Sequence, residues 1–247
     1  MKKIIITICI AICFPVFLSH AQDNQLTRKE KRAGWILLFD GKTLDGWRAQ
    51  GDSALPPTAG WSVEDNCLKV EWNKAGGNKN IVTKSEYANF EFSIEWKIAP
   101  AANSGILYHH GDKFTKASPC TAPEYQIIDD LGWPDPLTED HFTGVDYDMH
   151  TVLKNKVLKS VGQFNVSKIV FINGHVEHWL NGKKILEFEA WTPDWYARLE
   201  KSMWNQEPCY GKNRSGAFML QNYTNCTLWF KNIKVRDSNR NEKTGNI

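Results

Sequence analysis

The sequence predicts an all-β protein built as a jelly-roll-like sandwich of two sheets. Along residues 90–98, five apolar side chains alternate strictly with polar ones, which is the period of a strand with one buried face. Asn-Gly pairs at 173–174 and 181–182 are typical of tight hairpin turns. About a dozen short strand-like segments follow one another with no long linker, and this pattern favours two packed sheets.

Taken in order, the expected strands share short length, apolar alternation and flanking turn residues. The segment 168–188 is expected to form a three-stranded meander around the two Asn-Gly turns. The one expected helix covers residues 193–201, with Thr192 as its N-cap. The strands are expected over residues 36–39, 61–63, 67–72, 90–98, 105–109, 124–128, 168–172, 175–180, 183–188, 217–221 and 227–235.

The composition excludes several other classes of protein. The 247 residues are 42% hydrophobic, which excludes a disordered chain, and 17 Gly with 10 Pro argue against a coiled coil. The chain has 30 Lys and Arg and 28 Asp and Glu. Because the positive charges are barely in excess, we expect no nucleic-acid partner. The 11 Trp residues suit stacking on sugar rings as well as packing in a core.

The first 21 residues have the pattern of a secretory signal peptide. Lys2 and Lys3 precede an apolar run from Ile4 to Leu18, and Ser19-His20-Ala21 follows as the expected cleavage region, with a cut after Ala21. The run is too short to span a membrane. We therefore expect an exported protein, periplasmic or secreted, with a single sandwich domain over residues 22–247. Four cysteines remain after cleavage, and several pairings are open, including a Cys120–Cys209 bond with Cys67 and Cys226 as buried thiols.

The strand 124–128 carries the first candidate site. Glu124 and Gln126 share one face, and Asp129 follows directly, so these polar groups could bind sugar hydroxyls or could simply form an exposed sheet face. His178 shares its face with Val176 and Leu180. If that face is core, His178 is a buried histidine, and if it lines a groove, His178 could exchange a proton near neutral pH.

A second candidate site lies between residues 146 and 150. Asp146, Asp148 and His150 alternate with apolar or aromatic residues, and Asp140-His141 lies just upstream. Two carboxylates and an imidazole on one face could hold a divalent cation, although a polar edge strand has the same pattern. No other cofactor is expected, since the sequence lacks a phosphate-binding glycine loop and a dinucleotide signature.

A conventional glycosidase is disfavoured by the number of carboxylates on the candidate strand. A retaining enzyme needs two carboxylates about 5–5.5 Å apart, whereas Glu124 is followed on its face by Gln126 and Ile128. A second strand would have to supply the partner, and Glu95 is the obvious candidate. The sequence also shows no nucleophile elbow and no HExxH motif.

Six segments, in this order, resemble the 3-keto-disaccharide hydrolase domain family, and the resemblance extends from about residue 34 to residue 236. It implies a sandwich of the concanavalin A-like lectin/glucanase type and action on sugars oxidised at carbon 3. The chain departs from the family at Gln221–Thr224, where the family often has Gln-Asp-His-Gly, and at His109, near which it often has an arginine. The six segments are 37–47 (LLFDGKTLDGW), 92–98, 103–106 (NSGI), 124–129 (EYQIID), 176–182 (VEHWLNG) and 229–234 (WFKNIK).

The activity implied by the resemblance needs only one carboxylate. A ketone at C3 acidifies the C2 proton, so that one base can form an enolate that expels the group on C1, after which water adds. As a hypothesis, Glu124 is the base and His178 the general acid, with Lys154 or a cation beside the enolate. A separate sugar 3-dehydrogenase would have to make the ketone. The expected substrate-binding residues are Glu95, Asn103, Tyr108, Gln126, Asp129, Lys154 and Trp179.

Two alternatives to this activity stay open at the level of sequence. A non-catalytic carbohydrate-binding module is favoured by the Trp content and by the altered segment Gln221–Thr224. A conventional two-carboxylate glycoside hydrolase would use Glu95 and Glu124.

Overall fold

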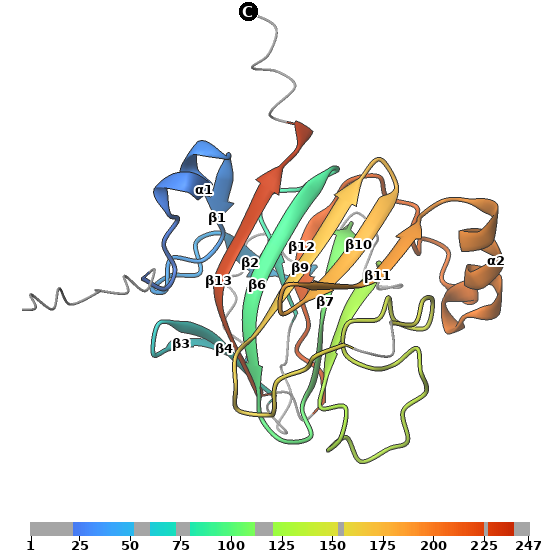
Figure 1. Ribbon diagram of the computed structural model, residues 1–247, viewed down its shortest axis with the longest axis horizontal. Helices are drawn as coiled ribbons and strands as arrows, with labels where there is room; N and C mark the ends of the chain where they lie inside the picture. Colours follow the sequence, from blue (N-terminus) through green and yellow to red (C-terminus); the bar gives the residue numbers. More distant parts are fainter. Residues whose placement is uncertain are drawn as a thin grey trace, which may run out of the picture.

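The computed structural model describes residues 22–51, 60–72, 80–111, 121–152, 156–224 and 227–239, and it confirms the predicted two-sheet sandwich (Figure 1). The large sheet has the order β11-β10-β9-β6-β13-β4-β3, with β1 also paired to β13, and the small sheet has the order β2-β5-β12-β7-β8. Every strand pair is antiparallel. The strands of the large sheet are β1 (Trp35–Leu37), β3 (Trp61–Glu64), β4 (Cys67–Glu71), β6 (Phe90–Ile98), β9 (Asn165–Ile172), β10 (His175–Leu180), β11 (Lys183–Glu189) and β13 (Thr227–Asp237). Those of the small sheet are β2 (Trp47–Ala49), β5 (Ile81–Thr83), β7 (Asn103–His110), β8 (Glu124–Ile128) and β12 (Ala217–Leu220).

The core lies between the two sheets and follows the predicted alternation. Along β6, every second residue from Phe90 to Ile98 is buried and the intervening residues are half-buried. The facing side chains of the small sheet include Ile106, Tyr125 and Phe218, which belong to the same buried cluster. Burial of this apolar area is the main force that holds the sheets together.

The meander β9-β10-β11 forms as predicted because its turn residues tolerate a left-handed backbone. Asn173 and Gly174 have φ values of 52° and 96°, and Asn181 and Gly182 have 48° and 82°. Two successive positive φ values are typical of the hairpin turn that matches strand twist. The register pairs His178 with Ile169 on one side and with Leu186 on the other.

The described residues contain three helical segments, where one was expected. The helix α2 (Pro193–Lys201) and its N-cap Thr192, which accepts from the backbone N–H of Trp195, confirm the prediction. The five-residue α1 (Arg28–Arg32) was missed, although Thr27 and Glu30 form a capping box that its sequence contains. A 3-10 turn, η1 (Met203–Gln206), follows α2. Figure 1 shows α1 and α2 at opposite ends of the sandwich.

The small sheet has an outer face, turned away from the core, that was only partly foreseen. Strands β2 and β5 were missed because three-residue strands carry too little alternation to be recognised. The register connects Arg48, Val82, Met219, Leu107 and Glu124 in one row across all five strands. This row places Glu124 at the β8 edge of the outer face.

Several expectations concern residues that lie outside the described ranges. They are the signal peptide over residues 1–21, Cys120, Cys226 and Lys154. Cys67 is a buried free thiol, as expected, and Cys209 is disulfide-bonded. In the described part of the chain, no helix is both long and apolar enough to cross a bilayer.

Candidate active site

Glu124 is a buried carboxylate that lies over a glycine of the neighbouring strand. Only 6% of the residue is exposed. A Cβ atom built on Gly105 would lie 1.7 Å from Oε1 of Glu124 and 2.5 Å from its carboxyl carbon. The missing side chain at Gly105 therefore creates the space that the carboxylate occupies.

The surroundings of Glu124 favour its protonated form. No hydrogen bond reaches its carboxylate from the described residues, and burial, together with the charge of Asp146, raises the pKa of Glu124 to about 8. A carboxyl with its pKa moved towards neutrality is suited to proton transfer. Among the described residues of this sandwich, Glu124 is the carboxyl group whose pKa is raised towards neutrality.

Residues 144–150 run along the edge of β8 that no other strand of the small sheet covers. They place a second carboxylate, that of Asp146, near Glu124. The N–H of Tyr147 donates to the carbonyl of Glu124, and the backbone of Asp146 forms an isolated antiparallel bridge with that of Tyr125. Asp146 is fully buried, and its Oδ2 lies 2.9 Å from Nδ1 of His150. Its Oδ1 has no hydrogen-bond partner among the described residues.

His178 lies in the core, and this decides between the two readings that its strand pattern allowed. The side chain is fully buried beside Val176 and Leu180. Burial lowers the pKa of His178 to about 4. Because Nδ1 lies 2.9 Å from the carbonyl of Gly144, which can only accept, Nε2 accepts from the hydroxyl of Tyr108 at 3.3 Å.

The proposed role of His178 as a general acid in contact with substrate is therefore wrong, and so is the expected binding of substrate by Tyr108. Both side chains are buried between the sheets and bonded to each other, and Nδ1 of His178 is bonded to the Gly144 carbonyl, so neither is free to contact a sugar. They form a satisfied polar pair within the core, and satisfied pairs of this kind help to specify a unique packing.

We expect the His178→Ala variant to lose stability. The substitution leaves a cavity and removes the acceptor of the buried Tyr108 hydroxyl, so the free energy of unfolding should fall by about 2–4 kcal/mol. His175→Ala, on the same strand but more than a third exposed, is the matched control and should change stability by less than about 0.5 kcal/mol. Denaturant unfolding measures both. A His178→Ala protein of wild-type stability that has lost turnover would contradict this assignment.

Glu95 and Trp179 lie on the wrong side of the sandwich to act with Glu124. Glu95 alternates with the buried Ile94 and Trp96 on the large sheet and accepts from the side chain of Asn232. Trp179 donates to Glu177, and Lys168 lies over its ring, also on the outer face of the large sheet. The core separates both from Glu124, since packed sheets are about 10 Å apart. A two-carboxylate hydrolase using Glu95 and Glu124 is therefore excluded.

Of the remaining predicted binding residues, one shares a strand face with Glu124, one lies on the adjacent strand and one has a structural role. Gln126 is buried on the same face of β8, and Asn103 is half-buried in the adjacent strand β7. Asp129 accepts from the backbone N–H groups of Ala101, Leu131 and Gly132. These bonds make Asp129 the organiser of the turn after β8.

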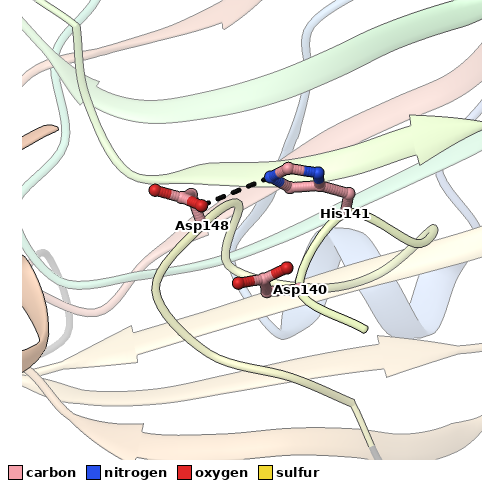
Figure 2. A group of neighbouring side chains, drawn as sticks. All are labelled: Asp140, His141 and Asp148. Carbon is pink, nitrogen blue, oxygen red and sulfur yellow. Dashed lines mark hydrogen bonds and ion pairs between the residues drawn. The ribbon is translucent and has the colours of Figure 1, made fainter. Parts of the chain in front are cut away.

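The residues expected to hold a cation separate into two groups. Asp146 pairs with His150 in the interior, whereas Asp148 faces Asp140 and His141, as Figure 2 shows. The potential ligand atoms of Asp140, His141 and Asp148 lie within 4.8 Å of one another. A carboxylate pair with an imidazole suits a divalent metal such as Zn²⁺ or Mn²⁺. The expected set of Asp146, Asp148 and His150 is therefore wrong in composition, and Asp148 is its one member in this cluster.

A cavity of about 830 Å³ lies apart from these residues. It is lined by parts of the segment 36–46, by residues 83–87 and by Asp237. None of the candidate site residues described above lines it. The chemistry of the site is therefore argued from Glu124 and its neighbours rather than from cavity size.

Two residues that matter here, Gly105 and Tyr210, could not be recognised from the sequence pattern. Gly105 lies within the NSGI segment, but only the register of β7 and β8 reveals that Glu124 lies over it. Tyr210 lies in a loop after η1, where no alternation exists to indicate a face. Its clustering with Trp195 and Met149 is a feature of the tertiary structure alone.

The small sheet of this two-sheet β-sandwich carries on its outer face a buried carboxylate with no hydrogen-bond partner among the described residues, and comparisons with known proteins identify the class as a carbohydrate-active enzyme. A family model described as a 3-keto-alpha-glucoside-1,2-lyase-like domain matches residues 34–236. A curated 3-keto-disaccharide hydrolase of Bacteroides thetaiotaomicron is 30% identical over 256 aligned positions, which cover 92% of this chain and 86% of that protein.

Two solved structures from Parabacteroides distasonis, both described as candidate glycosyl hydrolases, also resemble this chain. One has a TM-score of 0.80 at 34% identity and covers 87% of this chain and 99% of its own. The other has a TM-score of 0.59 at 26% identity and covers 82% and 98%. The chain belongs to the 3-keto-alpha-glucoside-1,2-lyase-like domain family. The predicted family and the predicted enzyme class, a glycoside hydrolase, are thereby confirmed.

Proposed function

We propose that this protein cleaves glycosides whose sugar carries a ketone at carbon 3, by elimination and hydration, with Glu124 as the base. The observation that carries this proposal is the single carboxylate on the outer face of the small sheet, buried and without a hydrogen-bond partner among the described residues. The substrate class is supported by the curated relative, which is named a 3-keto-disaccharide hydrolase.

The proposed reaction balances with one protein carboxylate. Glu124 takes the C2 proton, and the C–H electron pair forms an enolate whose charge lies on the C3 oxygen. The enolate re-forms the ketone and expels the oxygen on C1, which takes the proton back from Glu124. Water then adds across the C1–C2 double bond, with its hydroxyl on C1 and its proton on C2. A positioned base contributes about 10²–10⁴-fold to such a step.

The substrate can be tested with paired disaccharides that differ only in oxidation at C3. We expect the protein to release sugar from the 3-keto disaccharide and to leave the unoxidised one intact, as followed by chromatography. Equal cleavage of both would favour a conventional glycosidase, and tight binding without turnover would favour a binding module. Either result would contradict the proposal.

The activity should depend on pH in a direction set by Glu124. A base must be ionised to act, and burial raises the pKa of Glu124 to about 8. We therefore expect kcat/KM for the 3-keto disaccharide to rise with pH, tenfold per unit at first, and to level off above about 8. A profile that is flat from pH 6 to pH 9, measured in overlapping buffers, would contradict the assignment of Glu124.

Three further expectations belong to this proposal. Export of the protein is supported by the disulfide at Cys209, since such bonds persist in oxidising compartments. The cluster of Asp140, His141 and Asp148 is proposed to bind a divalent cation. A separate sugar dehydrogenase would supply the C3 ketone, because the chemistry begins with that group already in place.

A further inference from the structure

A buried tyrosine outside the predicted site, Tyr210, has a hydroxyl group without a hydrogen-bond partner in the described part of the chain. Only 1% of the residue is exposed, and its Oη is one of the few buried polar side-chain atoms that no described group satisfies. Leaving a buried hydroxyl unpaired costs stability, so such groups are rare unless a bound molecule completes them.

The ring of Tyr210 is held by aromatic packing. It stacks on Trp204, with ring centroids 5.4 Å apart and an interplanar angle of 6°, and on Trp195, at 6.0 Å and 13°. The next residue, Gly211, has a φ of 63°, and a Cβ there would lie 2.3 Å from the Trp195 ring. The direction of the Tyr210 hydroxyl is therefore fixed before any ligand binds, which is the condition for effective transition-state stabilisation.

The same packing connects Tyr210 to Glu124. The indole N–H of Trp204 donates to the carbonyl of Tyr147, whose own N–H donates to the carbonyl of Glu124. Burial and the charges of Asp146 and Glu124 raise the pKa of Tyr210 well above its usual value, so its hydroxyl keeps its proton. Tyr210 is thus a hydrogen-bond donor whose ring packs on Trp204, and Trp204 in turn is bonded to Tyr147, the residue paired with Glu124.

Tyr108, another buried tyrosine, cannot take this role. Its hydroxyl donates to Nε2 of His178, which is neutral and accepts there because its Nδ1 faces the Gly144 carbonyl. The proton of Tyr108 is committed within the core, whereas the proton of Tyr210 is not.

We propose that Tyr210 is a second catalytic residue, whose hydroxyl donates a hydrogen bond to the C3 oxygen of the substrate as the enolate forms. This inference rests on the proposed function, because it assigns the group that the enolate requires. When Glu124 removes the C2 proton, negative charge moves to the C3 oxygen, and a preorganised donor stabilises that charge more than it stabilises the ketone. The Tyr210 proton is shared with the oxygen and is not transferred, so the balance of the reaction is unchanged.

The test is Tyr210→Phe, with Tyr196→Phe as the matched control. Tyr196 packs edge-on against the same Trp195 ring but is half exposed. We expect Tyr210→Phe to lower kcat on the 3-keto disaccharide by about 10²–10³-fold with little change in KM. Its Tm should stay at or above that of the wild type, because the lost hydroxyl had no partner. Tyr196→Phe should leave kcat, KM and Tm unchanged.

Failure of this inference differs from failure of the proposed function. A wild-type protein that does not cleave the 3-keto disaccharide would overturn both. A wild-type protein that cleaves it, together with a Tyr210→Phe variant whose kcat lies within threefold of wild type, would overturn the role of Tyr210 alone. A fall in kcat matched by a lower Tm would also overturn that role, since the hydroxyl would then be structural.

Discussion

Glu124→Gln should abolish turnover while leaving the fold intact. The amide has nearly the same shape as the carboxyl group but cannot accept the C2 proton, so kcat on a 3-keto disaccharide should fall by about 10²–10⁴-fold. The carboxylate makes no hydrogen bond to the described residues that the amide would break. The matched control is Glu95→Gln, on the outer face of the large sheet. Gln126→Glu is unsuitable because it would add a charge beside the base. Glu95→Gln should keep wild-type turnover.

The same Glu124→Gln variant should gain stability at alkaline pH. The pKa of Glu124 is about 8 in the folded protein, above its usual 4.5, so the folded state holds the proton more tightly than the unfolded state. The stability that this confers is fully present below about pH 4.5 and is lost as the pH rises through about 8. Glutamine never ionises, so the variant should exceed wild type at pH 9 by on the order of a few kcal/mol and match it near pH 4. A variant less stable than wild type at pH 9, as measured by urea unfolding, would contradict the burial of an unpaired charge.

Gly105→Ala should inactivate the protein by displacing Glu124. An added methyl group would lie 1.7 Å from Oε1 of Glu124, so the carboxylate must leave its position above β7. We expect kcat/KM to fall by about 10²-fold or more, because a misplacement of about 1 Å can cost that much. A steady-state assay on the 3-keto disaccharide measures the loss.

Gly132→Ala is the matched control for this substitution. Its added Cβ would lie 2.2 Å from Oδ2 of Asp129, so it also displaces a carboxylate, but one that holds the turn after β8 through backbone N–H groups. Gly132→Ala should lower Tm and preserve turnover in the protein that remains folded. Equal retention of activity in both variants would show that the position of Glu124 over Gly105 is irrelevant to the chemistry.

Much of the fold could be predicted because its strands carry strong local signals. The alternation in β6 and the Asn-Gly turns around β10 depend only on neighbouring residues, so periodicity and turn chemistry determine them. Strands β2 and β5 have three residues each and acquire their identity from pairing with each other and with β12. Such pairing is a long-range property that a sequence pattern does not contain.

The site was harder to predict because alternation shows that residues share one face of a strand. It does not show whether that face points into the core or outward, or to which sheet the strand belongs. Glu124, Glu95 and Trp179 all lie on polar faces of their strands, but Glu124 belongs to the small sheet and the other two to the large one. His178 shares a face with apolar neighbours, which was compatible with core and groove alike. Tyr210 lies in a loop whose position depends on packing against Trp195 and Trp204.

In the proposed mechanism, the ketone of the substrate makes its C2 proton removable by one carboxylate. Cleavage of a 3-keto disaccharide in D₂O, followed by NMR of the released 3-keto sugar, tests it most directly, with C4 as an internal reference for exchange without enzyme. We expect one solvent deuterium at C2 in every molecule released, well above the level at C4. Released sugar that keeps its original hydrogen at C2 would contradict it.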